Sequence, residues 1–109
     1  MNPQLTKIMP VLQSFKADLQ QLYGDQMDGL ILYGSYARGD AKEESDIDVL
    51  VLLKQMQSPY TEIRKMGDIN NDYLLRYEYV ISPVPTTTER YKTVSIPLYR
   101  NIEKEGIVL

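Results

Sequence analysis

The sequence predicts a small mixed β-sheet flanked by helices, an α/β (α+β) fold. Two continuous apolar runs, 30–33 and 49–53, are short and bounded by turn residues, as is typical of buried strands. Before and after these runs, apolar residues recur at steps of three and four, which indicates helices. Strands that alternate with helices around one sheet give an α/β or α+β architecture.

Length and composition favour a single domain over residues 1–109. A chain of 109 residues that is 43% hydrophobic and 25% charged can bury a modest core. The sequence contains no cysteine and no histidine, which excludes disulfides, thiolate or imidazole metal sites and Ser-His-Asp catalysis. Any metal must therefore be held by oxygen atoms.

Charge and hydropathy limit the partners and the location. The net charge of −3 argues against a general nucleic-acid binder. No apolar run approaches the ~20 residues of a membrane span, and the first ten residues lack the pattern of a signal peptide. We therefore expect a cytoplasmic protein with no membrane partner and no direct nucleic-acid partner.

An apolar stripe at helical spacing predicts the first helix. Asn2 before Pro3 marks its start and Gly24 marks its end. Pro10 falls inside the pattern, which predicts a kink or a restart near that position. We interpret the stripe as core packing, and its members are Leu5, Ile8, Leu12, Phe15, Leu19 and Leu22.

Two strands and a second long helix follow. The strands are predicted at 28–33 and 46–53. Ser58 is the expected cap of the helix and Pro59 its first residue. The inner face of this helix is predicted to carry Tyr60, Ile63, Met66, Ile69 and Tyr73.

The last third of the chain predicts one more strand and a closing helix. The strand is expected at 77–82, with Pro83 and Pro85 stopping it. Residues 86–92 are predicted to form a loop with one helical turn, and residues 95–105 a helix that Gly106 ends. The inward side chains of this helix are predicted to be Ile96, Tyr99 and Ile102.

Asp46 and Asp48 open the second strand and are the strongest candidates for a metal site. Side chains two positions apart on a strand point to the same face, so the two carboxylates lie side by side. Their repulsion beside an apolar layer is costly unless a cation neutralises them. Mg2+ meets that need, because it takes oxygen ligands and keeps water positions free. The alternative interpretation is a solvated edge.

Gly34 and Ser35 follow the first strand and are candidates for a phosphate-binding turn. Gly34 allows a sharp turn and a close approach to a ligand. Ser35 can cap a short helical turn at 36–38, which leaves free N–H groups directed at an anion. A phosphate-holding turn opposite a metal-holding strand suits metal-assisted phosphoryl chemistry. The same residues would also form a simple strand-to-helix turn.

Gly34-Ser35, ten further residues and then Asp46-Ile47-Asp48 resemble the signature of the polymerase-β-type nucleotidyltransferases. Within that superfamily, the chain resembles the small stand-alone minimal nucleotidyltransferases (MNT). The string GSYARGDAKEESDIDVLVLL matches the family pattern through its flanks, and the stretches ISPVP and PLYRNIEKEG extend the resemblance to roughly residues 28–107. The resemblance implies the polymerase-β-type fold, two Mg2+ ions and ATP as the substrate.

The resemblance also implies roles for these residues. Asp46 and Asp48 would be catalytic and bridge the metal ions, and Gly34 and Ser35 would contact the β- and γ-phosphates. Relatives often carry a third carboxylate on the next strand. Glu78 is the acid in that predicted strand, so we include it as a catalytic and metal-binding candidate.

Two of these assignments have alternatives in the sequence itself. Glu78 could instead be an exposed glutamate on an edge strand. Arg38 lies in the connector between the two strands, where a cation could neutralise a triphosphate, so it is a further candidate for nucleotide binding. Acidic residues surround it, and a charged solvated loop is the alternative.

The resemblance implies a function: Mg2+-dependent transfer of AMP from ATP to a protein hydroxyl. The chain resembles, in size and motif, the antitoxin halves of two-component bacterial modules in this family, which silence a HEPN-domain ribonuclease by adenylylating a tyrosine. The chain shows no obvious second domain to select a small molecule or an RNA end. Two alternatives stay open: a non-catalytic antitoxin that blocks its partner by contact, and a nucleotidyltransferase that acts on an aminoglycoside-like hydroxyl.

Overall fold

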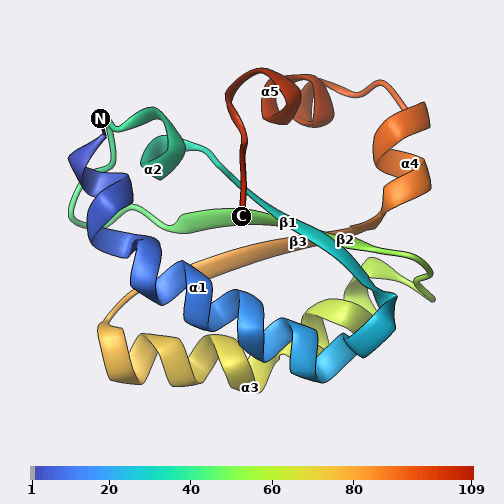
Figure 1. The fold of residues 1–109 in the computed structure, drawn as a ribbon, viewed down its shortest axis with the longest axis horizontal. Helices are drawn as coiled ribbons and strands as arrows, with labels where there is room; N and C mark the ends of the chain where they lie inside the picture. Colours follow the sequence, from blue (N-terminus) through green and yellow to red (C-terminus); the bar gives the residue numbers. More distant parts are fainter. Residues whose placement is uncertain (1) are drawn as a thin grey trace.

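The structure, a computed structural model that describes residues 2–109, has a mixed sheet between two layers of helices (Figure 1). The strands are β1 (Met27–Tyr33), β2 (Ile47–Leu53), β3 (Ile81–Thr87) and β4 (Ile107–Val108). Their order is β3-β2-β1-β4, with β2 parallel to β3 and antiparallel to β1. The predicted mixed sheet flanked by helices is confirmed.

The first helix, α1 (Pro3–Tyr23), begins and ends where its sequence signals predict. The Asn2 side chain accepts hydrogen bonds from the backbone N–H groups of Gln4 and Leu5, and Gly24 ends the helix at φ 56°. The predicted restart at Pro10 is wrong, since α1 continues through it as one helix. Pro10 is exposed, so water can satisfy the carbonyl that loses its partner.

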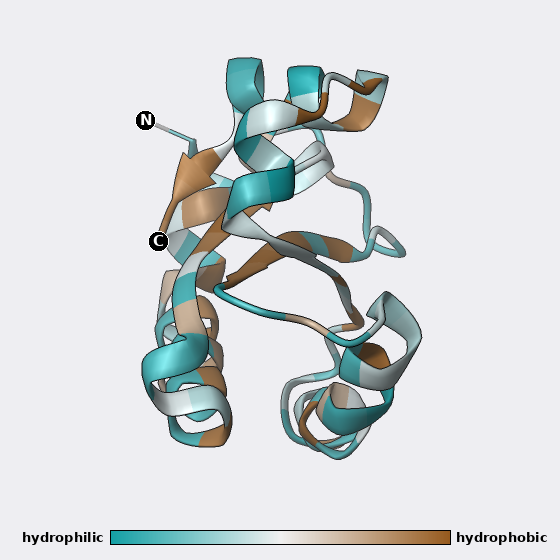
Figure 2. Ribbon diagram, turned by 90° about the vertical axis from the view of Figure 1, so that its right-hand side faces the viewer, coloured by the Kyte–Doolittle hydropathy of each residue, from teal (hydrophilic) through white to brown (hydrophobic). Residues whose placement is uncertain are grey.

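The apolar stripe of α1 packs on one face of the sheet, together with α3 (Pro59–Tyr77). Ile8, Leu12, Phe15 and Leu19 are fully buried as predicted, whereas Leu22 is 43% exposed. Alternate residues of β2 point into this layer, and its other residues point into a smaller layer below α5. Because β2 is covered on both faces, its residues 49–53 form an uninterrupted apolar run. Figure 2 shows the hydrophobic strands enclosed between helices with hydrophilic outer faces.

The inner face of α3 is only partly the predicted one. Ser58 caps the helix as expected, accepting a hydrogen bond from the N–H of Thr61 at 3.1 Å. Met66 and Tyr73 are fully buried, but Tyr60 and Ile63 are largely exposed. Glu62 turns inward in their place and accepts a hydrogen bond from the Tyr23 hydroxyl at 3.0 Å. A buried carboxylate at the start of the helix concealed the true phase from the apolar pattern.

The predicted third strand at 77–82 is also wrong. Helix α3 runs on to Tyr77, and β3 begins later and contains both Pro83 and Pro85. β3 pairs with β2 alone, at the edge of the sheet. Proline is tolerated on an edge strand because its nitrogen can face the unpaired side. The prolines therefore mark the edge of the sheet and do not mark the end of the strand.

The chain closes with α4 (Thr88–Thr93) and α5 (Pro97–Glu105) on the second face of the sheet (Figure 1). Tyr99 and Ile102 lie on the inner face of α5 and are buried, as predicted. Gly106 ends α5, and β4, which was not predicted, then pairs with β1. No helix in the part of the chain that the structure describes combines enough length and apolar character to cross a membrane.

Candidate functional site

The turn after β1 lies directly against Asp48. Gly34 has φ 79° and caps the short helix α2 (Ser35–Arg38). A Cβ atom at Gly34 would overlap Oδ2 of Asp48. Both the left-handed backbone and this close approach require glycine. Ser35 is the first residue of α2, so the prediction that its side chain caps this helix is wrong.

The start of α1 holds this turn in place. The Asn2 side-chain amide donates to the carbonyl oxygen atoms of Tyr36 (2.9 Å) and Ala37 (3.3 Å). Gln4 and the backbone of Ala41 exchange two hydrogen bonds, at 2.6 and 2.9 Å. The residues at the start of α1 thus hold α2 and the segment that follows it, although the bonded residues lie 34 to 37 positions apart in the chain.

Asp46 and Asp48 stand at the beginning of β2, beside β3. Asp48 pairs with Ser82 in the parallel ladder, and the Ser82 hydroxyl donates to Oδ2 of Asp46 at 3.0 Å. Asp46 is exposed to solvent, whereas Asp48 is partly buried. The sequence interpretation missed Ser82. The ISPVP stretch could have indicated it, had the prolines been interpreted as residues of an edge strand.

The two carboxylates oppose each other electrostatically. Burial, and then the negative charge of Asp46, raise the pKa of Asp48, and the positive charge of Arg38 acts in the opposite direction. A bound cation would remove this penalty. Two carboxylates and a neighbouring hydroxyl fit Mg2+, which is usually held by one or two carboxylates and completed by water and phosphate oxygen atoms.

Glu78 does not stand where the sequence predicted. It follows the last residue of α3, caps that helix and adopts φ 60°, so it is not on a sheet strand. Within residues 2–109, no three acidic side chains gather closely enough to hold a metal ion together. The structure therefore gives no support to Glu78 as a third ligand beside Asp46 and Asp48.

Arg38 is already engaged by two acids. Its Nε donates to Asp40 at 3.2 Å, and its Nη1 donates to both carboxylate oxygen atoms of Glu105, at 3.1 and 3.2 Å. The bond to Asp40, followed by the bond to Glu105, raises the pKa of Arg38. Glu105 also accepts a hydrogen bond from the N–H of Gly34 at 3.2 Å. No local sequence signal connects Glu105, at the end of α5, with the turn after β1.

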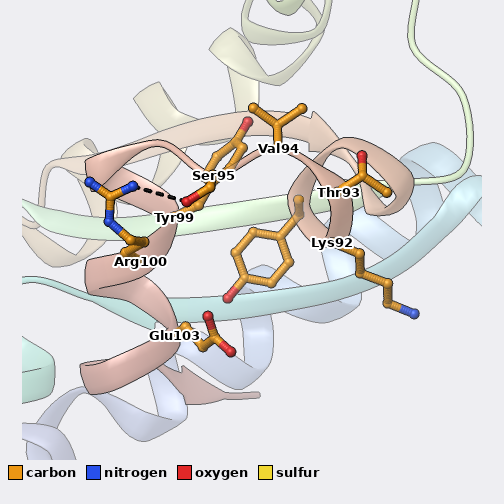
Figure 3. A pocket seen from close by; sticks show the side chains of 8 residues that line it. Lys92, Thr93, Val94, Ser95, Tyr99, Arg100 and Glu103 are labelled. Atoms are coloured by element: carbon orange, nitrogen blue, oxygen red, sulfur yellow. Dashed lines mark hydrogen bonds between the residues drawn. The ribbon is translucent and has the colours of Figure 1, made fainter.

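A separate hollow lies between α4 and α5, and none of the predicted site residues lines it (Figure 3). The guanidinium of Arg100 donates to the Ser95 hydroxyl at 2.9 Å, and both residues line the hollow together with Glu103 and Lys92. This hollow is thus distinct from the carboxylate pair and the Gly34 turn.

A stability prediction follows from the raised pKa of Asp48. The pKa of Asp48 is higher in the folded protein than in the unfolded chain, so protonation of Asp48 stabilises the folded state. This contribution to the free energy of unfolding is complete below the unfolded pKa and is lost as pH rises through the folded pKa. Asp48→Asn should therefore raise the melting temperature at pH 7 in EDTA and change it less at pH 3. Thermal denaturation at both pH values measures this, and an equal shift at both would contradict the electrostatic cause.

The fold and this site are those expected of a nucleotidyltransferase: Asp46 directly precedes β2, and Asp48 within β2 lies against the glycine-led turn that ends β1. The chain matches the model of the nucleotidyltransferase domain over residues 12–109. It belongs to this family.

Relatives and a solved structure agree with this assignment. The chain is 38% identical over 101 residues to a protein of Methanocaldococcus jannaschii provisionally named a protein adenylyltransferase, covering 93% of this chain and 97% of that one. It is 39% identical over 54 residues to the protein adenylyltransferase MntA of Thermococcus cleftensis, covering 50% and 52%. Its fold resembles a crystal structure of a toxin-antitoxin with AMP-PNP (TM-score 0.61, 17% identity, 87% and 69% covered).

Proposed function

We propose that this protein is a cytoplasmic, Mg2+-dependent adenylyltransferase that moves AMP from ATP to a tyrosine hydroxyl of a HEPN-type ribonuclease toxin. It thereby acts as the antitoxin. The observation that carries the proposal is the packing of the Asp48 carboxylate against the Gly34 turn, beside Asp46. Relatives named as protein adenylyltransferases and the likeness to a toxin-antitoxin structure support this choice of reaction and partner.

In this proposal different residues bind the metal ions and the phosphates. Asp46 and Asp48 would hold the Mg2+ ions, and such ions would supply positive charge to the triphosphate and to the pyrophosphate that leaves. The backbone N–H groups of Gly34 and Ser35 would bind the β- and γ-phosphates, since they lie at the start of a helical turn. The triphosphate is thereby aligned across the beginning of β2.

The transfer itself exchanges one phosphorus–oxygen bond for another. The acceptor hydroxyl oxygen attacks the α-phosphorus, the bond from that phosphorus to the bridging oxygen breaks, and pyrophosphate leaves. In this proposal the hydroxyl proton passes to a carboxylate of the aspartate pair. Positioning and charge stabilisation supply most of the rate enhancement in such reactions.

An exposed site suits an acceptor that arrives on another protein. Asp46 is exposed, and Ser82 reaches it at the outer edge of the sheet. A tyrosine on a partner surface can therefore approach without entering a deep pocket. Selection of the acceptor then depends on contacts between the two proteins around the site.

Ser35→Ala tests the role of the turn. Its hydroxyl lies at the start of α2 but does not cap that helix, so its removal should cost little stability. In this proposal the Ser35 hydroxyl donates to the phosphates together with the backbone N–H groups, and alanine removes that hydroxyl alone. We expect AMP transfer to the toxin to slow by about 10²-fold, the size typical of losing one preorganised donor at a charge-bearing site. Intact-mass measurements over time, with excess Mg-ATP, follow the transfer.

Ser95→Ala is the matched control, since it removes a hydroxyl near the distant hollow between α4 and α5. It should transfer AMP at the wild-type rate. If Ser35→Ala keeps full activity but melts at a lower temperature, Ser35 is structural and the proposed phosphate turn is wrong.

A further inference from the structure

A carboxylate occupies one of the N–H donors that the proposed function gives to the triphosphate, together with Arg38, which the sequence made a candidate for nucleotide binding. Glu105 Oε1 accepts the N–H of Gly34 at 3.2 Å, and both oxygen atoms of Glu105 accept from Nη1 of Arg38. The Glu105 side chain is 27% exposed. One backbone N–H and one guanidinium are also the partners that proteins offer to phosphate oxygen atoms.

The carboxylate and a phosphate cannot use these donors together. The N–H of Gly34 has one hydrogen, and Glu105 accepts it. A phosphate oxygen placed there would meet a second negative charge at close range, which is strongly unfavourable in a partly buried site. A triphosphate therefore has to displace the side chain of Glu105 before it binds the turn.

The surroundings restrict this displacement to the side chain. Helix α5 is anchored by the buried Ile102, and a Cβ atom at Gly106 would overlap the Ile102 carbonyl and the Ile31 side chain. The backbone next to Glu105 is thus packed closely on β1. The side chain itself has three rotatable bonds and borders solvent, so it can swing out.

Arg38 can change partners without moving its anchor. It is 47% exposed and keeps a second bond, from Nε to Asp40, that does not involve Glu105. When Glu105 leaves, Nη1 becomes free to donate to the incoming phosphate. The guanidinium then pairs with the phosphate in place of the displaced Glu105 carboxylate.

We propose that Glu105 is a specificity-determining residue that competes with the ligand for the Gly34 turn. It admits ligands that carry β- and γ-phosphates with their metal, and it keeps the turn closed to weaker anions. AMP, which has no β- or γ-phosphate, does not reach this position and is unaffected. This inference rests on the proposed function, because it assumes that the turn binds the triphosphate.

Calorimetric titration of the full chain with Mg-ATP and with AMP tests the inference. Glu105→Gln keeps a hydrogen-bond acceptor for Gly34 but removes the charge. It should bind Mg-ATP about tenfold more tightly than wild type and bind AMP equally, since a charge-assisted competitor is lost. The gain should shrink as salt is added.

Two further variants control this experiment. Glu103→Gln removes the same charge from α5, but Glu103 lines the separate hollow and should leave both affinities unchanged. Glu105→Asp keeps the charge and shortens the reach toward Gly34 and Arg38, so it should give part of the gain. It also serves if Glu105→Gln fails to fold.

The possible outcomes separate the two proposals. If wild type binds Mg-ATP and Glu105→Gln binds it equally or more weakly, Glu105 only positions Arg38 and the inference is overturned, while the proposed function stands. If neither wild type nor any variant binds Mg-ATP, the proposed function fails and the inference fails with it.

Discussion

Replacing both Asp46 and Asp48 by asparagine is expected to abolish AMP transfer, a loss of at least about 10³-fold, and to leave the fold intact. Asparagine keeps the size of each side chain but removes the charge that would hold Mg2+. Because burial and the neighbouring charge raise the pKa of Asp48, the wild-type pair is already unfavourable without a cation. The double variant should therefore melt no lower than wild type in EDTA.

Three measurements check this prediction. Calorimetry should show loss of Mg-ATP binding, intact mass should show no AMP on the partner, and circular dichroism should show an unchanged fold. Asp68→Asn with Asp72→Asn is the matched control, because it removes two exposed charges from α3 and should leave transfer unchanged. Undiminished Mg-ATP binding and transfer in the Asp46 and Asp48 double variant would overturn the site assignment.

The sequence correctly predicted the helix boundaries that are determined by residues close to them in the chain. Asn2 and Gly24 delimit α1, and Ser58 caps α3, because each acts on backbone groups a few residues away. The strand β3 was misplaced because the meaning of Pro83 and Pro85 depends on whether a strand lies at the edge of the sheet. Strand order is a long-range property that no local pattern contains.

The same distinction applies to the candidate site. The turn at Gly34 and the carboxylate of Asp48 face each other across two adjacent antiparallel strands, which the sequence spacing predicted. Ser82 reaches Asp46 through a parallel pairing, and Glu105 reaches Gly34 across 71 residues of chain. Tertiary packing alone creates these contacts. Glu78 failed as a prediction for the same reason, since its strand begins later in the chain.

A small amount of this protein should modify an excess of its partner if it is an enzyme. A binding antitoxin must instead be present at least one-for-one, whatever the nucleotide. We expect sub-stoichiometric protein with Mg-ATP to shift the mass of the toxin by one or more AMP units, about 329 Da each. The toxin should lose its ribonuclease activity in parallel with that shift.

The double variant of Asp46 and Asp48 makes this test decisive, because it separates catalysis from contact. Its other surfaces are unchanged, so it should still bind the toxin but leave its mass and its ribonuclease activity as they were. Replacing the two carboxylates by amides removes the proposed metal ligands and the proposed proton acceptor, and it leaves the size of both side chains almost unchanged. If the mass of the toxin never changes, and one equivalent of the double variant silences it as well as wild type does, the catalytic interpretation is wrong. The protein would then be a binding antitoxin built on a nucleotidyltransferase fold.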